Sequence, residues 1–238
     1  MSDATVRRSG RLRRALARVT LLELLALAIA VIAIVLFGLL ARAVLDAEVA
    51  AFNHAALTSI HRLSSPALDT LAIAITWLGN VPTVVVLGLA LGIALRRSGR
   101  RIDAWVLGAV LGGGGILSIT LKAAFDQTRP QVFEHVYAAA GQSFPSGHSL
   151  ISYCLWGFVA TWLLSSDPRN PLRWLGAGLC IAVATSVALS RLYLGVHWPS
   201  DIVAGLLVAA FWLATCFIGR QAVRRRVARR EDLEPDRA

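Results

Sequence analysis

Long apolar runs with few charges dominate this chain and limit the folds that it can adopt. Of its 238 residues, 56% are hydrophobic and only 16% are charged, and the mean hydropathy is +0.64. A soluble domain of this size normally carries more charge. A helix needs about 20 mostly apolar residues to cross the hydrocarbon core of a bilayer, and runs of roughly that length recur here. The sequence therefore predicts an all-α, polytopic membrane bundle that forms a single domain over residues 1–238.

We expect about six transmembrane helices in this bundle. They cover approximately Val19 to Ala43, Val81 to Leu95, Ala104 to Phe125, His148 to Leu164, Leu172 to Leu189 and Ile202 to Ile218. Residues 47–60 are too polar to span, so they predict an interfacial helix after the first span. Leu68 to Leu78 is apolar but too short to cross alone, and a dip into the membrane beside the second span is one arrangement open to it.

Basic residues are distributed unevenly between the two sides of these predicted spans. Nineteen of the 24 lie in residues 1–18, in the loops around residues 96–101 and 169–173, and in residues 219–238. Positive charge concentrates on the cytoplasmic side of membrane proteins. Both termini are therefore predicted to be cytoplasmic basic tails. Because the basic segments flank membrane spans, the net charge of +10 indicates orientation, and we expect no nucleic-acid partner.

Three polar clusters lie at the ends of apolar runs on the opposite, extracytoplasmic side. They are Lys122-x6-Arg129-Pro130, Pro145-Ser146-Gly147-His148, and Ser190-Arg191-x5-His197-x3-Asp201. Lys122 is the only lysine of the chain. An ammonium group can follow a moving phosphoryl group, and a guanidinium group can hold two of its oxygens. Together with two histidines, these cations predict a phosphate site with its own nucleophile.

The spacing within the second and third clusters supports that chemistry. Pro145 to Gly147 opens a predicted helix whose free amides can bind an anion. Asp201 follows His197 by four residues, so its carboxylate can accept a hydrogen bond from one imidazole nitrogen and leave the other free to attack. Ser200 is a weaker candidate nucleophile, because no histidine is obviously placed to deprotonate it. Snorkelling cations, a capping loop and a structural His–Asp pair explain each cluster alone, but not all three together.

These three clusters, K-x6-R-P, P-S-G-H and S-R-x5-H-x3-D, resemble the signature of the type-2 phosphatidic acid phosphatase superfamily in full and in order. That superfamily includes bacterial membrane lipid phosphatases, glucose-6-phosphatase and vanadium haloperoxidases. The resemblance covers roughly Leu68 to Phe217. The first predicted span and both basic tails lie outside it.

The resemblance implies a role for each candidate residue. His197 is the nucleophile that forms a phosphohistidine, Asp201 orients it, and His148 protonates the leaving group and later activates water. The phosphate oxygens are then held by Lys122, Arg129, Ser146, Gly147 and Arg191. No metal or cofactor is implied. Glu134 and His135 have no ligand-like spacing to a third residue, so we expect them to be solvated.

The function predicted from these features is hydrolysis of a membrane lipid phosphate or diphosphate at the extracytoplasmic face. Undecaprenyl diphosphate, phosphatidylglycerol phosphate and phosphatidic acid are the substrates that the resemblance suggests, and no residue chooses among them. Two other functions use the same signature. A vanadate-dependent haloperoxidase is typically soluble, and a non-catalytic lipid transporter or scaffold normally loses one of the two histidines, whereas this chain keeps both.

Overall fold

The structure is a computed structural model that describes residues 3–133, 137 and 139–233, and it consists of eight helices with no strand among those residues. The helices are α1 (Asp3–Leu45), α2 (Ala50–His61), α3 (Pro66–Trp77), α4 (Val81–Arg97), α5 (Arg101–Phe125), α6 (Gly147–Ser166), α7 (Pro171–Tyr193) and α8 (Pro199–Leu233). The predicted all-α fold is therefore confirmed.

Five of these helices are long and apolar enough to cross a bilayer alone, and they contain five of the six predicted spans. The remaining predicted span corresponds to α4, which has 17 residues and follows α3 after a bend of 45°. Together α3 and α4 pass the same test as one broken span or a re-entrant loop. The apolar segment from Leu68 to Leu78 is thus a separate short helix that continues into α4 at an angle.

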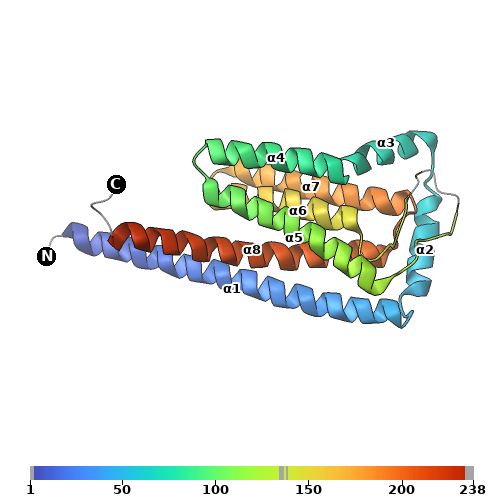
Figure 1. The fold of residues 1–238 in the computed structure, drawn as a ribbon, viewed down its shortest axis with the longest axis horizontal. Coiled ribbons are helices and arrows are strands. Elements are labelled where there is room, and N and C mark those ends of the chain that lie inside the picture. Colours follow the sequence, from blue (N-terminus) through green and yellow to red (C-terminus); the bar gives the residue numbers. More distant parts are fainter. Residues whose placement is uncertain (1–2, 134–136, 138, 234–238) are drawn as a thin grey trace.

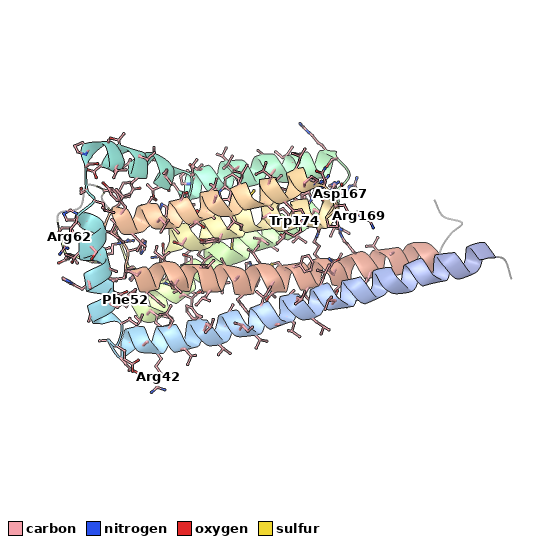
Figure 2. All side chains as sticks on the ribbon, turned by 180° about the vertical axis from the view of Figure 1, so that it is seen from behind. Arg42, Phe52, Arg62, Asp167, Arg169 and Trp174 are labelled. Atoms are coloured by element: carbon pink, nitrogen blue, oxygen red, sulfur yellow. The ribbon has the colours of Figure 1, made fainter. Side chains whose placement is uncertain are left out.

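Figure 1 shows α4 to α7 packed side by side, with α8 along one side of them and α1 against α8. The start of α1 and the end of α8 lie together at one end, and α2 crosses the opposite end of the bundle. This placement of α2 agrees with the predicted interfacial helix. In Figure 2, the side chains of Arg42, Phe52 and Arg62 mark the α2 end, whereas Asp167, Arg169 and Trp174 mark the other end of α6 and α7.

The helix α6 forms the centre of the bundle, where the main core gathers around Leu150, Cys154 and Phe158. Four successive glycines of α5, Gly112 to Gly115, favour close helix packing, and two of them meet a neighbour closely. A Cβ at Gly113 would lie 2.2 Å from the Trp212 ring of α8, and one at Gly114 would lie 3.0 Å from the sulfur of Cys154. Cys154 and Cys180 are buried and Cys216 is half-buried, and all three are free thiols.

The last helix is longer than the sequence suggests, because α8 continues through the predicted basic tail to Leu233. A buried ion-pair cluster stabilises this extension. Asp103 of α5 accepts a hydrogen bond from Arg220 at 2.7 Å and two from Arg224 at 2.9 and 3.0 Å. Arg225 also pairs with Glu23 of α1. These contacts fix α8 to α5 and α1 at the end of the molecule away from α2.

Candidate active site

The three polar clusters meet at the end of the bundle that α2 crosses (Figure 1). The first cluster begins in the last turn of α5, the second forms the start of α6, and the third joins the end of α7 to the start of α8. His197 interacts electrostatically with Lys122, Arg129, His148 and Arg191. The structure therefore brings together residues that are up to 79 positions apart in the sequence.

His197 and Asp201 form the buried centre of this site. The Nδ1 atom of His197 lies 3.2 Å from Oδ2 of Asp201, and the two side chains are 1% and 0% exposed. The same Oδ2 accepts a hydrogen bond of 2.9 Å from the amide of Trp198. A carboxylate held in this way favours the tautomer of His197 that carries its proton on Nδ1, which leaves Nε2 with a lone pair.

Arg129 occupies the other side of the His197 ring. Its Nη1 atom lies 3.3 Å from Nε2 of His197 and donates a 2.8 Å hydrogen bond to the carbonyl of Val196. Its remaining donors reach the backbone carbonyls of Gly141, Ala140 and Gln142. The guanidinium group is thus held by backbone carbonyls from two segments, residues 140–142 before α6 and Val196 before α8. To grip a phosphate with two donors, Arg129 must exchange some of these carbonyl contacts.

The start of α6 has the form of an anion-binding helix terminus. Ser146 is the N-cap residue, and its Oγ accepts hydrogen bonds from the amide and the hydroxyl of Ser149 at 3.4 and 3.0 Å. The amide of Ser146 donates to the carbonyl of Asp201 at 3.0 Å, which joins the second and third clusters. A Cβ on Gly147 would lie 3.1 Å from the hydroxyl oxygen of Ser118, so glycine lets α6 approach α5 here.

Two buried nitrogen atoms of the site have no hydrogen-bond partner within the described part of the chain. They are Nε2 of His148 and Nε of Arg191. Buried polar atoms are normally paired, and a catalytic or binding role is one explanation for an unpaired one. Both atoms are therefore available to contact a substrate.

Arg191 and Lys122 are each positioned by a residue that sequence reasoning did not identify. The Nη1 atom of Arg191 donates a 2.9 Å hydrogen bond to Oγ1 of Thr76, which is buried in α3. The guanidinium group also lies over the ring of Tyr137, 4.9 Å from its centroid. Lys122 donates to the carbonyl of Gln142. The signal for Thr76 was a hydroxyl in an apolar helix, but its partner lies 115 residues away and cannot be identified from spacing.

Asn53 of α2 contacts the start of α8, next to His197 and Asp201. Its side-chain amide donates to Oγ of Ser200 at 2.8 Å, and its carbonyl oxygen accepts from the Ser200 amide at 3.2 Å. Both residues are buried. The Ser200 hydroxyl is therefore engaged in a structural contact, which weakens its candidacy as a nucleophile further.

Burial and nearby cations control the protonation of the candidate nucleophile. Burial lowers the pKa of His197 well below its usual range, and the positive charges of Arg129, Arg191 and Lys122 lower it further. The imidazole is consequently neutral at physiological pH, the form that can attack phosphorus. Burial also lowers the pKa of Arg129, while the carboxylate of Asp201 acts in the opposite direction.

Within the described residues, no three His, Cys, Asp or Glu side chains group closely enough to hold a metal ion. Glu134 and His135 lie outside the described residues, so their predicted solvation is not tested. Asp126, one turn after Lys122, accepts a 3.1 Å hydrogen bond from the side chain of Gln142.

The family model of the PAP2 superfamily matches residues 103–225, which is more than half of the chain. The chain belongs to the PAP2 superfamily. The resemblance inferred from the three clusters is thereby confirmed. All eight candidate site residues of this PAP2 protein lie within the matched region, whereas Asn53 and Thr76 lie before it.

Curated relatives and a solved structure agree with this assignment. The chain is 27% identical to phosphatidylglycerophosphatase B of Bacillus subtilis over 173 residues, covering 71% of this chain and 83% of that protein. It is 36% identical to phosphatidylglycerophosphatase B of Escherichia coli over 105 residues, covering 41% of this chain and 39% of that protein.

The crystal structure of a transmembrane PAP2-type phosphatidylglycerolphosphate phosphatase from Bacillus subtilis superposes with a TM-score of 0.73 at 25% identity. The superposition covers 80% of this chain and 96% of that one. This PAP2 protein is therefore a multi-pass membrane phosphatase.

Proposed function

We propose that this PAP2 protein hydrolyses a phosphate monoester or diphosphate of a membrane lipid through a phosphohistidine at His197. The observation that carries the proposal is the setting of the His197 ring. Asp201 contacts Nδ1 at 3.2 Å, and Arg129 lies 3.3 Å from Nε2. The imidazole is neutral and its Nε2 is held in one orientation, as an in-line nucleophile requires. The cation beside it can stabilise the charge on a phosphoryl group.

In the first step, Nε2 of His197 forms a bond to phosphorus while the bond from phosphorus to the leaving oxygen breaks. His148 donates a proton to that oxygen, so a lipid alcohol or lipid phosphate leaves. The ring of His197 gains positive charge as the new bond forms. Asp201 stabilises that charge through Nδ1, because its carboxylate is buried against the ring.

In the second step, His148 accepts a proton from water, and the water oxygen attacks phosphorus. The bond between phosphorus and Nε2 of His197 breaks, inorganic phosphate leaves, and the free imidazole is restored. His148 thus acts as an acid in the first step and as a base in the second, because its proton moves in opposite directions in the two steps.

The cations and the start of α6 supply the electrostatic part of the proposal. Lys122, Arg129 and Arg191 surround the histidines, and α6 presents its first amides next to the Ser146 hydroxyl. These donors would hold the oxygens of the transferring phosphoryl group and stabilise its negative charge in the transition state.

The position of the site favours a substrate that remains partly in the membrane. The candidate residues lie at the ends of membrane-spanning helices, within reach of a phosphate at the bilayer surface. The relatives named phosphatidylglycerophosphatase B support phosphatidylglycerol phosphate as the first substrate to test. Undecaprenyl diphosphate and phosphatidic acid are the other two candidates.

Phosphate release by the purified protein tests this proposal. Each of the three lipids is presented in the same mixed micelles, with and without excess EDTA, and the His197→Ala variant serves as the background. We expect release from at least one lipid, persistence in EDTA, and inhibition by orthovanadate as a mimic of the pentacoordinate transition state. No release from any of the three lipids, or activity that EDTA removes and magnesium restores, would contradict the proposal.

We also propose that the site faces the extracytoplasmic side and that both termini are cytoplasmic, because basic residues concentrate at the opposite end of the bundle. Single cysteines in a cysteine-free variant test this orientation. Exposed positions Leu63 and Gln131 at the α2 end should react with an impermeant thiol reagent in intact cells. Exposed positions Ser98 and Arg169 should react only after lysis. The reverse pattern would invert the orientation.

A further inference from the structure

A groove between α4 and α5 opens on the outer surface of the bundle and extends to the α4–α5 loop, away from the active site. Its volume is about 370 Å³. Glycines and aliphatic side chains form most of its wall, among them Gly88, Gly92, Gly108, Val85, Leu107 and Leu111. Leu111 packs against Gly88, but a Cβ added at Gly108 would meet no atom within 4 Å and one at Gly92 would lie 4.0 Å from its nearest neighbour, so this part of the groove has room for a narrow apolar chain.

A cation and an aromatic ring lie at the end of this groove nearest the α4–α5 loop. Arg96 and Trp105 both line it, and the guanidinium carbon of Arg96 lies 5.9 Å from the centre of the Trp105 ring. Trp105 is 71% exposed although it belongs to a membrane-spanning helix. Tryptophan and arginine at the end of a span are typical of the level of the lipid headgroups.

The charge around this end of the groove is positive. The six residues 96–101, which include the α4–α5 loop, contain four arginines, at positions 96, 97, 100 and 101. Arg100 turns toward α6, where it contacts Ser166 at 3.3 Å and lies over the Trp162 ring. The nearby carboxylate of Asp103 is already paired with Arg220 and Arg224. Arg96 therefore faces the groove without a competing acidic group among the described lining residues.

We propose that this groove binds an anionic phospholipid from the leaflet opposite the active site, with an acyl chain along the glycines and its phosphate at Arg96. Basic pockets between transmembrane helices are suited to such headgroups. The proposal does not depend on which lipid the active site hydrolyses.

A second groove provides a comparison within the same molecule. It lies between α6, α7 and α8, has a volume of about 700 Å³, and has no charged residue among its described lining. It is larger and also apolar, so apolar character alone would favour it as a lipid site. The α4–α5 groove is distinguished by the cation at its end, and selectivity for an anionic headgroup should therefore be confined to it.

Lipid binding to the purified full-length protein tests the proposal. Delipidated protein is titrated with phosphatidylglycerol or with phosphatidylcholine of the same acyl chains, and bound lipid is counted by native mass spectrometry. We expect phosphatidylglycerol to bind more tightly, and Arg96→Gln to weaken it by about tenfold, as loss of one charge-assisted hydrogen bond implies. Arg97→Gln, which changes charge equally outside the groove lining, should have little effect.

Filling the groove gives an independent result. Gly108→Leu should reduce binding of phosphatidylglycerol, whereas Gly178→Leu in the second groove should not, and an added Cβ meets open space at both positions. Should Gly108→Leu not fold, Gly92→Leu replaces it, because a Cβ there lies 4.0 Å from its nearest neighbour. The Lys122→Ala variant tests whether the counted lipid is bound in the active site and not in the α4–α5 groove, because Lys122 belongs to the active site.

Equal binding of the two lipids, equal losses in Arg96→Gln and Arg97→Gln, or loss of the bound lipid in Lys122→Ala would each overturn the proposal. Selective losses in Arg96→Gln and Gly108→Leu, with phosphate hydrolysis retained, would establish it.

Discussion

The guanidinium group of Arg129 lies 3.3 Å from Nε2 of His197, on the opposite side of the ring from Asp201. The ring therefore has a carboxylate at one nitrogen and a cation at the other. This arrangement keeps the imidazole neutral, since a proton on Nε2 would face the positive charge of Arg129 directly. It also places a cation next to the position that a phosphoryl group would take when Nε2 attacks phosphorus.

This relationship predicts the acidic side of the pH profile. Because the pKa of His197 is lowered by burial and by nearby cations, the neutral nucleophile should persist below pH 6.5 and be lost only when the pH falls through the lowered pKa. Arg129→Gln removes one cation, so the pKa should rise and the acidic limb of kcat/KM should move to higher pH. The measurement is kcat/KM for p-nitrophenyl phosphate between pH 3 and 9 in both proteins.

The ionisation of p-nitrophenyl phosphate affects both proteins equally, so it does not contribute to the difference between their pH profiles. Arg62→Gln provides the control, because Arg62 is exposed and follows α2 outside the site. An acidic limb that stays in place, or moves to lower pH, in Arg129→Gln would show that this cation does not control the protonation of His197.

Asn53 should act as a positioning residue. Replacing it with alanine leaves the amide and hydroxyl of Ser200 without their buried partner, which costs about 1–3 kcal/mol. Since Asp201 is the next residue, we expect kcat to fall about tenfold or more with KM little changed. Ser59→Ala is the matched control, because Ser59 is an exposed residue of the same helix whose hydroxyl donates to the Ala55 carbonyl. A changed KM with normal kcat would assign Asn53 to binding instead.

Thr76→Val should weaken phosphate binding. The substitution keeps the side-chain shape and removes the oxygen that accepts from Arg191 at 2.9 Å, so the guanidinium group loses its fixed position. We expect inhibition by orthovanadate to weaken about fivefold to tenfold, as expected for one charge-assisted hydrogen bond. Thr70→Val, whose hydroxyl binds only the Pro66 carbonyl within α3, should leave the inhibition constant unchanged. Equal effects in both variants would indicate a general disturbance of α3.

Local sequence patterns identify some features of this site. The His197–Asp201 contact follows from a spacing of four residues, and the N-cap role of Ser146 follows from its place before an apolar run. The contacts of Asn53 and Thr76 could not be predicted in this way. Their partners are 147 and 115 residues away, so the contacts depend on how α2 and α3 pack against α8 and α7.

The length of α8 could not be predicted for a similar reason. Hydropathy falls after Ile218, so the sequence indicated the end of the span but not the end of the helix. The helix continues because Arg220 and Arg224 both reach Asp103 from successive turns of α8. Asp103, just before the predicted span that begins at Ala104, had no visible partner in the sequence, and only the packing of α5 against α8 supplies one.

This cluster predicts a large loss of stability in Asp103→Asn. Removing the carboxylate charge leaves Arg220, which is 4% exposed, without its ionic partner, and breaking a buried ion pair in this way costs about 3–5 kcal/mol. The midpoint of thermal unfolding in detergent should fall by several degrees. Asp167→Asn, in the loop between α6 and α7, is the control and should unfold as the unmodified protein does. An unchanged midpoint would mean that the cluster does not hold the end of α8.

The two histidines should fail in different ways, because a nucleophile and a proton donor have different tasks. His197→Ala should abolish hydrolysis of every substrate. His148→Ala should be severe for a lipid substrate, whose leaving oxygen needs a proton, and milder for the first step with p-nitrophenyl phosphate, whose leaving group departs as an anion. The second step of the His148→Ala variant should stay slow, since no base activates water. Rapid quenching of His148→Ala with labelled p-nitrophenyl phosphate should therefore trap an acid-labile, base-stable phosphoprotein at residue 197. Ser200 is engaged with Asn53, so label on Ser200, or turnover by His197→Ala, would rule out the proposed roles.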